Sequence, residues 1–310
     1  MIRLLLIALL LPLQAGTTID VSPDGKGDHA TLQAAIDAIP ADRKTGYSIR
    51  LGPGTYREKI HIPADKPPIR LVGAGADKSI IVWNDAAKTP DSSGQELGTF
   101  RSATMTVGSS EFSAEGLTIE NSYGTGSQAL ALRVTGDRCA FKNVSLLAWQ
   151  DTLLVQTGRQ YFEDCTISGH VDFIFGGSTA WFERCTIVCR GDGYITAAST
   201  PAESPYGLVF HACKIRAEKE ATKVLLGRPW QNSPATIFIR CELPASIRPE
   251  GWDNWGDPAK EKTARYLEHR NSGPGAATAG RVSWAKQMDD LAAREITPRV
   301  VLKGWQPASR

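Results

Sequence analysis

Two copies of nearly the same hexapeptide, FEDCTI at 162–167 and FERCTI at 182–187, decide the fold of this chain. Each has a Phe, four further residues, and then Leu or Ile. Four related segments share that pattern: FSAEGL (112–117), FKNVSL (141–146), FHACKI (210–215) and FIRCEL (238–243). Successive Phe residues are 29, 21, 20, 28 and 28 positions apart. A short apolar unit that recurs at this length is typical of a solenoid. We therefore predict an all-β fold, a parallel β-helix in which each coil buries its apolar face against the next.

The two ends of the chain depart from the repeat. Apolar residues at helical spacing predict a short helix within 28–40, which Pro40 would end and which would cap the first coil. A second short helix is expected at 288–295. No linker or change of composition interrupts the chain, so we expect one domain over residues 16–310.

The N-terminal sequence MIRLLLIALLLPLQAG (1–16) predicts a signal peptide over residues 1–15. A membrane anchor is the alternative, but the apolar run from Leu4 to Leu13 is short for a bilayer. We expect a protein that is secreted or periplasmic, with no membrane attachment after cleavage. The 310 residues hold 35 Lys and Arg against 33 Asp and Glu, a net charge of +2, which gives no case for nucleic acid as a partner.

Export would permit disulfide bonds. Cys165, Cys185, Cys213 and Cys241 share one position of the repeat. Neighbouring coils lie about 4.8 Å apart, which is within disulfide reach, so Cys165 and Cys185 are the predicted pair. A column of buried free thiols is the alternative. The pairing of Cys139, Cys189, Cys213 and Cys241 stays open, and no cysteine or histidine spacing indicates a metal site.

Several polar residues interrupt the apolar pattern of the repeat. They are Gln128 in SQALAL, Gln150 and Asp151 in WQDTLL, Asp172 in VDFIFG, and Arg228 and Trp230 in LLGRPW. They fall on different coils, and a parallel stack can bring such residues together along one groove.

These residue types suit ester chemistry. One Asp could attack an acyl carbon, and the other could give and take a proton. Two Gln amides could hold the tetrahedral oxyanion. Arg228 could pair with Asp172 and keep it ionised within its apolar surroundings. The alternative is structural: a buried Asp can bind turn amides, Gln can form ladders along the stack, and Trp230 can be part of the core.

The same residues resemble those of the pectinesterase (pectin methylesterase) family. Its motifs occur in family order over nearly the whole mature chain: GTYREKI (54–60), TFRSAT (99–104), QALAL (128–132), QDTL (150–153), VDFIFG (171–176), LGRPW (226–230), PEGWDNW (249–255) and YLEHRNSGPGAATAGRVSW (266–284). The chain departs from the family pattern at Leu154, where Tyr is common, and at Gly177–Ser178.

The resemblance implies a right-handed parallel β-helix that hydrolyses methyl esters of homogalacturonan without a cofactor. It implies that Asp172 is the nucleophile and Asp151 the general acid and base. Gln128 and Gln150 would form the oxyanion hole, Arg228 would orient Asp172, and Trp230 would contact the sugar. Phe100, Tyr194 and Trp255 are further candidates for the substrate groove.

From these roles we predict opposite protonation states for the two carboxylic acids. Arg228 should lower the pKa of Asp172. The apolar neighbours Trp149 and Leu153, together with the charge on Asp172, should raise the pKa of Asp151. Methyl-esterified polygalacturonate is the expected substrate, and a monomer is expected. Two rival functions remain: an esterase or thioesterase acting on a non-pectin ester, and a non-catalytic carbohydrate-binding β-helix.

Overall fold

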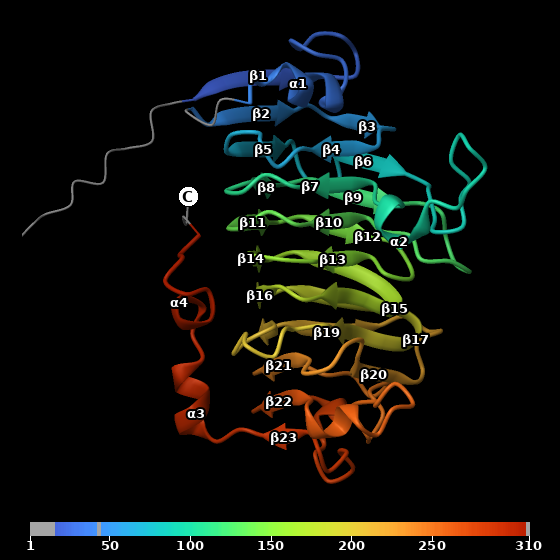
Figure 1. Cartoon of the computed structure of the whole chain (residues 1–310), viewed down its shortest axis with the longest axis vertical. Helices are drawn as coiled ribbons and strands as arrows, with labels where there is room; N and C mark the ends of the chain where they lie inside the picture. Colours follow the sequence, from blue (N-terminus) through green and yellow to red (C-terminus); the bar gives the residue numbers. More distant parts are fainter. Residues whose placement is uncertain (1–15, 42–44, 308–310) are drawn as a thin grey trace, which may run out of the picture.

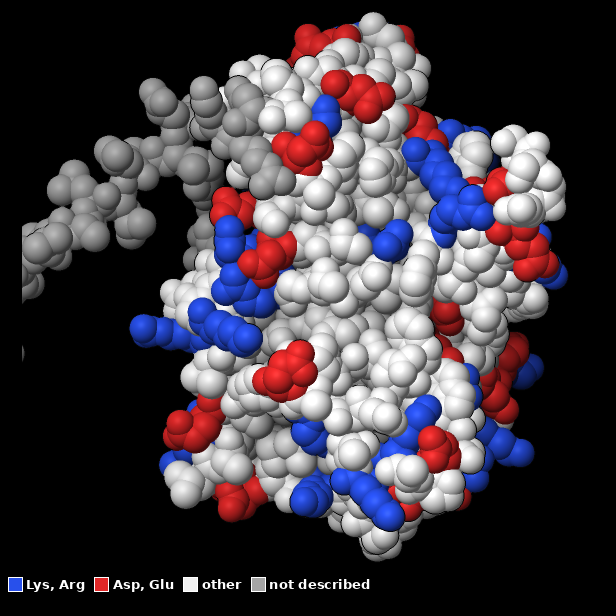
Figure 2. Space-filling model, in the orientation of Figure 1, with Lys and Arg blue, Asp and Glu red and all other residues white. Residues whose placement is uncertain are grey.

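The computed structural model describes residues 16–41 and 45–307, so the predicted signal peptide at 1–15 lies outside the described residues. The chain winds into a stack of parallel strands, as predicted (Figure 1). None of the described helices is long and apolar enough to cross a membrane. On the face drawn in Figure 2, charges of both signs are interspersed around a broad uncharged area.

One long face of the stack is an eleven-stranded parallel sheet, which we call sheet A. In spatial order its strands are β1 (Thr17–Val21), β2 (Tyr47–Leu51), β5 (Ile69–Gly73), β8 (Ser113–Glu115), β11 (Cys139–Lys142), β14 (Arg159–Glu163), β16 (Thr179–Glu183), β18 (Leu208–His211), β21 (Ala235–Ile239), β22 (Arg265–His269) and β23 (Lys286–Gln287).

The remaining strands form sheet B, which consists of two ribbons joined through the long strands β15 (Thr166–Gly176) and β17 (Thr186–Ala198). The first ribbon continues through β3 (Gly54–Tyr56), β6 (Ser79–Trp83), β9 (Thr118–Asn121), β12 (Ser145–Leu147) and β19 (Lys214–Ala217). The second continues through β4 (Ile60–Ile62), β7 (Met105–Val107), β10 (Leu132–Val134), β13 (Leu153–Val155) and β20 (Val224–Pro229). Both β15 and β17 bend from one ribbon to the other, so each spans two faces of the coil.

A ladder of phenylalanine rings runs up the core. Phe141, Phe162, Phe182, Phe210 and Phe238 are fully buried, and successive rings stack with centroids 4.5–4.8 Å apart. The predicted place of Phe112 as the first Phe of this ladder needs correction. Phe112 lies two residues out of register, because Phe141 pairs with Ala114 of β8, and the Phe112 ring is tilted by 50°.

The turn from sheet A to sheet B has the same form in five coils. The residue two positions after each ladder Phe has φ between 50° and 53°, and the buried Cys or Val comes next; these turn residues are Asn143, Asp164, Arg184, Ala212 and Arg240. This left-handed conformation turns the chain by a sharp angle at the cost of some local strain. The sequence repeat therefore encodes a corner as well as a core position.

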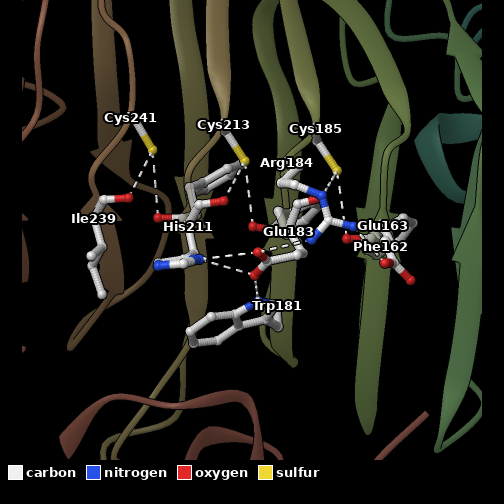
Figure 3. A network of polar contacts seen from close by, with 12 residues as sticks. Phe162, Glu163, Trp181, Glu183, Arg184, Cys185, His211, Cys213, Ile239 and Cys241 are labelled. Atoms are coloured by element: carbon white, nitrogen blue, oxygen red, sulfur yellow. Dashed lines mark hydrogen bonds and ion pairs between the residues drawn. The ribbon is translucent and has the colours of Figure 1, made fainter. Parts of the chain in front are cut away.

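The predicted Cys165–Cys185 disulfide is wrong in this structure, because all six cysteines are free thiols. Cys165, Cys185, Cys213 and Cys241 stack in a column, and each Sγ donates to the carbonyl of the ladder Phe one coil earlier at 3.3–3.5 Å; Figure 3 shows the last three. Side chains at equivalent positions of parallel coils point the same way, whereas a disulfide needs Cβ atoms that approach each other. Burial also raises the pKa of the Cys165 thiol.

Helix α1 (Leu32–Ala38) confirms the predicted N-terminal cap, with Leu32, Ala35 and Ile36 buried against the first coils. The predicted C-terminal helix is also present as α3 (Asp290–Glu295), but it does not close the far end of the stack. Together with α4 (Pro298–Val301) it runs alongside sheet A (Figure 1). Val301 and Leu302 bury the outer face of β16, β18 and β21. The remaining short helices are α2 (Gly98–Arg101), η1 (Lys260–Lys262) and η2 (Pro274–Ala276).

Candidate active site

The polar residues singled out in the sequence come together on neighbouring coils of the second ribbon of sheet B. Gln128 forms a parallel bridge with Gln150, and the amide of Ala129 donates to the carbonyl of Gln150 at 3.1 Å. The amide of Asp151 donates in turn to the carbonyl of Val171, also at 3.1 Å. Stacking thus sets Gln128, Gln150–Asp151 and Val171–Asp172 one above another.

The backbone at both aspartates is unusual. Asp151 has a φ of 65° and Asp172 a φ of 52°, a left-handed conformation that Asp tolerates better than most residues. The pairing of β15 with β17 shifts register between Val171 and Ile174. Gly169 makes room for this irregularity, since a Cβ there would lie 2.3 Å from the Cβ of Phe173. Phe173 and Ile174 can then both enter the core while the Asp172 carboxylate turns toward Arg228.

Asp172 and Arg228 form the predicted ion pair. Nε of Arg228 donates to Oδ1 at 2.8 Å, and Nη2 donates to Oδ2 at 2.6 Å. Both carboxylate oxygens accept an N–H from a group that can only donate, which is the arrangement of an ionised carboxylate. The side chain of Asp172 is 9% exposed and that of Arg228 is 19% exposed.

The predicted direction of the pKa shift at Asp172 needs correction. Burial is the largest influence and raises the pKa of Asp172, while the hydrogen bonds and charge of Arg228 oppose that rise. The guanidinium therefore limits the cost of desolvating this carboxylate rather than pushing the pKa below its usual range.

Two aromatic rings hold the Arg228 guanidinium. Its Cζ lies 3.9 Å from the ring centroid of Tyr194 and 3.7 Å from that of Trp255. Two rings can both lie this close to one planar guanidinium only if they stack on its opposite faces. Trp255 has a φ of 63°, and its amide donates to Oδ1 of Asp253 at 2.6 Å, which fixes the turn. Tyr194 and Trp255, which we predicted at the substrate, thus contact Arg228.

Asp151 has a different environment. It is 8% exposed, and no other described side chain or amide hydrogen-bonds its carboxyl group. Burial raises the pKa of Asp151 well above its usual value, and the negative charge of Asp172 raises it further, as predicted. The attraction of Arg228 is a smaller, opposing influence. An unpartnered, buried carboxyl group of this kind favours the protonated form.

Gln128 and Gln150 are half-buried residues, and neither side-chain amide has a hydrogen-bond partner among the described residues. Their N–H groups are therefore available to an incoming oxygen.

Beside these polar groups lies a small apolar cluster on the outer face of the sheet: Ala103, Leu130, Leu154, Phe175 and Ala197, with Trp230 and Trp255 packed against it. The Trp230 ring meets Phe175 edge-on, with centroids 5.6 Å apart. Phe100 lies in α2 and is 39% exposed. Rings next to polar groups are a common surface for sugars, whose faces are apolar.

Sequence reasoning missed Asp253, which fixes the Trp255 turn through a hydrogen bond to the amide two residues on; an Asp at the start of DNWG (253–256) is the local signal that could have indicated it. Among residues 16–41 and 45–307, no cluster of three or more His, Cys, Asp or Glu could hold a metal ion. A groove of about 910 Å³ lies elsewhere, beside sheet A and the C-terminal segment, and none of the candidate residues lines it.

Comparison with known proteins identifies the family of this chain. The Pectinesterase family model matches residues 18–304. Pectinesterase 31 of Arabidopsis thaliana is 41% identical over 281 residues, covering 88% of this chain and 89% of that protein. The structure of the pectin methylesterase from carrot superposes with a TM-score of 0.87 at 34% identity, covering 94% of both chains. A pectin methylesterase solved in complex with a hexasaccharide gives a TM-score of 0.84 at 32% identity, covering 94% of this chain and 98% of that one. With a β-helix of the same build and a family match over nearly all of its length, this chain belongs to the pectinesterase family.

Proposed function

We propose that this protein is a pectin methylesterase that hydrolyses the methyl esters of homogalacturonan to methanol and free carboxylate. The observation that carries the proposal is the contrast between two neighbouring buried aspartates. Asp172 is held as an anion by a bidentate Arg228, and Asp151 has no partner and a raised pKa.

In the first half of the reaction, an Asp172 oxygen attacks the ester carbonyl carbon. The carbonyl electrons move onto oxygen, and the amide N–H groups of Gln128 and Gln150 stabilise the resulting oxyanion. When the tetrahedral intermediate collapses, the C–O bond to the methoxy group breaks. Asp151 gives that oxygen its proton, so methanol leaves and an acyl–Asp172 anhydride remains.

In the second half, the Asp151 carboxylate takes a proton from water as the water oxygen attacks the acyl carbon. Collapse of this second intermediate returns Asp172 as a carboxylate, leaves Asp151 as an acid, and releases the uronic acid, which loses its remaining proton to solvent. Trp230 and Phe100 would position the sugar chain on the outer face of sheet B. We also propose that residues 1–15 direct export, in keeping with a substrate found outside the cell.

The test is methanol release from methyl-esterified polygalacturonate by the wild type and by Asp172→Asn. Release of acetate or of a thiol from other esters in place of methanol would favour the rival esterase or thioesterase. Binding of pectin without methanol release would favour the carbohydrate-binding alternative. Mass spectrometry of peptides from a single turnover, quenched while methanol is being released, should detect the galacturonyl group on Asp172; methanol release with no acyl group on Asp172 at any time point would instead indicate direct attack by water.

A further inference from the structure

The groove beside sheet A is separate from the candidate active site. It has a volume of about 910 Å³, and none of the residues of that site lines it. Its floor is the outward-facing row of the first coils, which strand pairing runs through Ser48, Arg70, Ser113, Ala140 and Tyr161. Its wall is the segment that follows α4, residues 305–307, which lies beside β8 and β11 (Figure 1). The groove thus lies between the first coils of sheet A and the C-terminal segment.

The later coils show what covers this face of the sheet elsewhere. There the same row continues through Trp181 and Val209, which are buried beneath Val301 and Leu302. Nη1 of Arg159 donates to the carbonyl of Leu302 at 3.3 Å, so the segment is fixed at the point where its cover ends. The groove is therefore an open continuation of a covered face, and the fold holds its wall in place.

Aromatic side chains line the groove. Tyr47, Tyr161 and Trp305 are half-buried, and each packs against buried apolar residues. Such side chains offer an apolar face and a polar edge together, which is the combination that a sugar ring requires. Sites of roughly 300–1,000 Å³ are the usual size for small ligands. Size and lining together favour a short stretch of a carbohydrate chain.

The charges of the groove favour an acidic carbohydrate. Four basic and three acidic residues line it: Arg70, Arg138, Lys142 and Arg299 against Glu111, Glu115 and Glu163. Each acidic residue forms an ion pair with one of the first three cations, so Arg299 is left without a partner among the described residues. Lys142 is held loosely, because its partner Glu163 lies 3.8 Å away and is bound more closely by Arg184, at 2.5 Å. The groove therefore has one uncompensated positive charge.

A second groove, of about 490 Å³, meets the first beside Pro298. It adds Arg240, at a corner of sheet A, and Arg294 of α3, both of which are exposed. Neither has a hydrogen-bond or ion-pair partner for its side chain among the described residues, whereas both acidic residues of this groove are bound to other arginines. Besides these two and Arg299, only Arg57 among the described arginines lacks such a partner. Unpaired arginines are thus concentrated in these two grooves.

We propose that the two grooves bind a de-esterified galacturonate chain at a distance from the candidate active site. This inference rests on the proposed function, whose product is that polyanion. Carboxylates of the chain pair with Arg240, Arg294 and Arg299, and sugar faces pack on Tyr161 and Trp305. No chemistry occurs here. A chain bound in the grooves tethers the enzyme to the polymer and raises the effective concentration of the remaining esters at the active site.

The experiment follows hydrogen exchange of residues 290–307 while fully de-esterified galacturonate oligomers are added. Exchange in the wild type should slow as the grooves fill. The triple variant Arg240→Gln, Arg294→Gln, Arg299→Gln should need about tenfold more oligomer for the same protection, the combined effect of three exposed charge pairs. Trp305→Ala should also weaken protection, because a ring face is lost. Added salt should weaken the protection of the wild type.

Kinetics supply a second measurement. For long, partly de-esterified polygalacturonate, KM for methanol release should be higher in the triple variant than in the wild type. The value of kcat, and KM for a short methyl-esterified oligomer, should stay at the wild-type values, since only a long chain can occupy the grooves and the active site together.

Arg57→Gln is the matched control, because it removes the same charge from an exposed, unpartnered arginine outside the grooves. It should leave both the protection and KM at the wild-type values, and thermal unfolding shows that each variant is folded. Equal protection in the wild type and the triple variant, or none in the wild type, would overturn the proposal. A dimer that the triple variant dissociates would also overturn it, since a second copy of the chain would then occupy the grooves. Methanol release without binding in the grooves leaves the proposed function standing, and binding without methanol release would overturn the proposed function alone.

Discussion

Two arginine–carboxylate pairs lie inside this molecule, and they are bonded in different ways. In the last coils, Arg281 donates Nε and Nη2 to the two oxygens of Glu268 at 2.8 and 3.2 Å. Its other N–H groups reach the carbonyls of Arg248, Pro249 and Gly275, and Glu268 also accepts from Trp252 and Asn271. The Asp172–Arg228 pair has no further hydrogen bonds from its side chains among the described residues.

The two pairs also differ in how deeply they are buried. The side chains of Arg281 and Glu268 are 4% and 2% exposed, against 19% and 9% for Arg228 and Asp172. A saturated pair stabilises a fold because no charge or donor is left without a partner. A pair with unused lone pairs stabilises less, but its carboxylate can still attack a substrate. The first pair should therefore matter for folding and the second for chemistry.

The largest expected effect is on activity. Asp172→Asn should lower kcat on the order of 10⁴-fold or more, because the amide cannot act as the nucleophile. The Arg281–Glu268 pair is intact in Asp172→Asn, so the circular dichroism spectrum of this variant should match that of the wild type. Methanol release measured on esterified polygalacturonate tests the prediction, and activity within tenfold of wild type would contradict it.

Asp151→Asn should lower kcat by about 10²–10⁴-fold, the usual contribution of general acid–base catalysis. Some turnover should survive, since Asp172 and both Gln amides remain in place. Single-turnover kinetics should locate the loss in the departure of methanol.

Asp151→Asn should also change how the free energy of unfolding depends on pH. The folded protein raises the pKa of Asp151, so the stability that this group contributes is fully present below its unfolded pKa of about 3.9 and is lost as pH rises through the folded value. Asn does not titrate. The free energy of unfolding of Asp151→Asn, relative to wild type, should therefore increase with pH above about 4. Urea unfolding at several pH values measures this, and a difference that falls with pH would show that Asp151 is ionised.

Glu268→Gln tests the other half of the comparison. Removing the charge leaves Arg281 buried without its anion, which typically costs about 3–5 kcal/mol of the free energy of unfolding. At temperatures where the variant is folded, kcat should stay near the wild-type value, because this pair is in the last coils. Arg70→Gln, which breaks an exposed pair, should change stability by no more than about 1 kcal/mol. An equal effect of both substitutions would show that burial does not distinguish them.

The sequence predicted the parts of this comparison that depend on repetition. The spacing of the Phe residues gave the stack, and the polar residues that interrupt it gave the site. Phe112 misled the alignment because Ala114 occupies its place in the ladder. The cysteine column also misled, since equal position in the repeat predicts proximity but not the direction of the Cβ atoms.

Other features could not be predicted because they depend on which partners a side chain finds. Arg133 of β10 and Arg228 of β20 look alike in the sequence, and only the folded structure shows that Arg133 donates to the Gln156 amide whereas Arg228 pairs with the Asp172 carboxylate. Likewise, the balance between burial and Arg228 at Asp172 depends on how deeply the carboxylate is desolvated. Neither the partners of an arginine nor the depth of burial of Asp172 can be read from the neighbouring residues in the sequence.

The smallest expected effect concerns the rings that hold Arg228. Backbone carbonyls hold Arg281 in place, whereas the ring faces of Tyr194 and Trp255 hold Arg228. Cation–π contacts of this kind contribute about 0.5–2 kcal/mol, so Trp255→Ala should lower kcat about two- to thirtyfold by letting Arg228 and Asp172 shift. Trp255→Phe should restore most of that loss, because a ring face returns. If Trp255 instead acts by contacting the sugar, KM should rise while kcat stays constant. Steady-state kinetics on polymeric pectin separates these two roles, and a constant kcat in Trp255→Ala would rule out the positioning role.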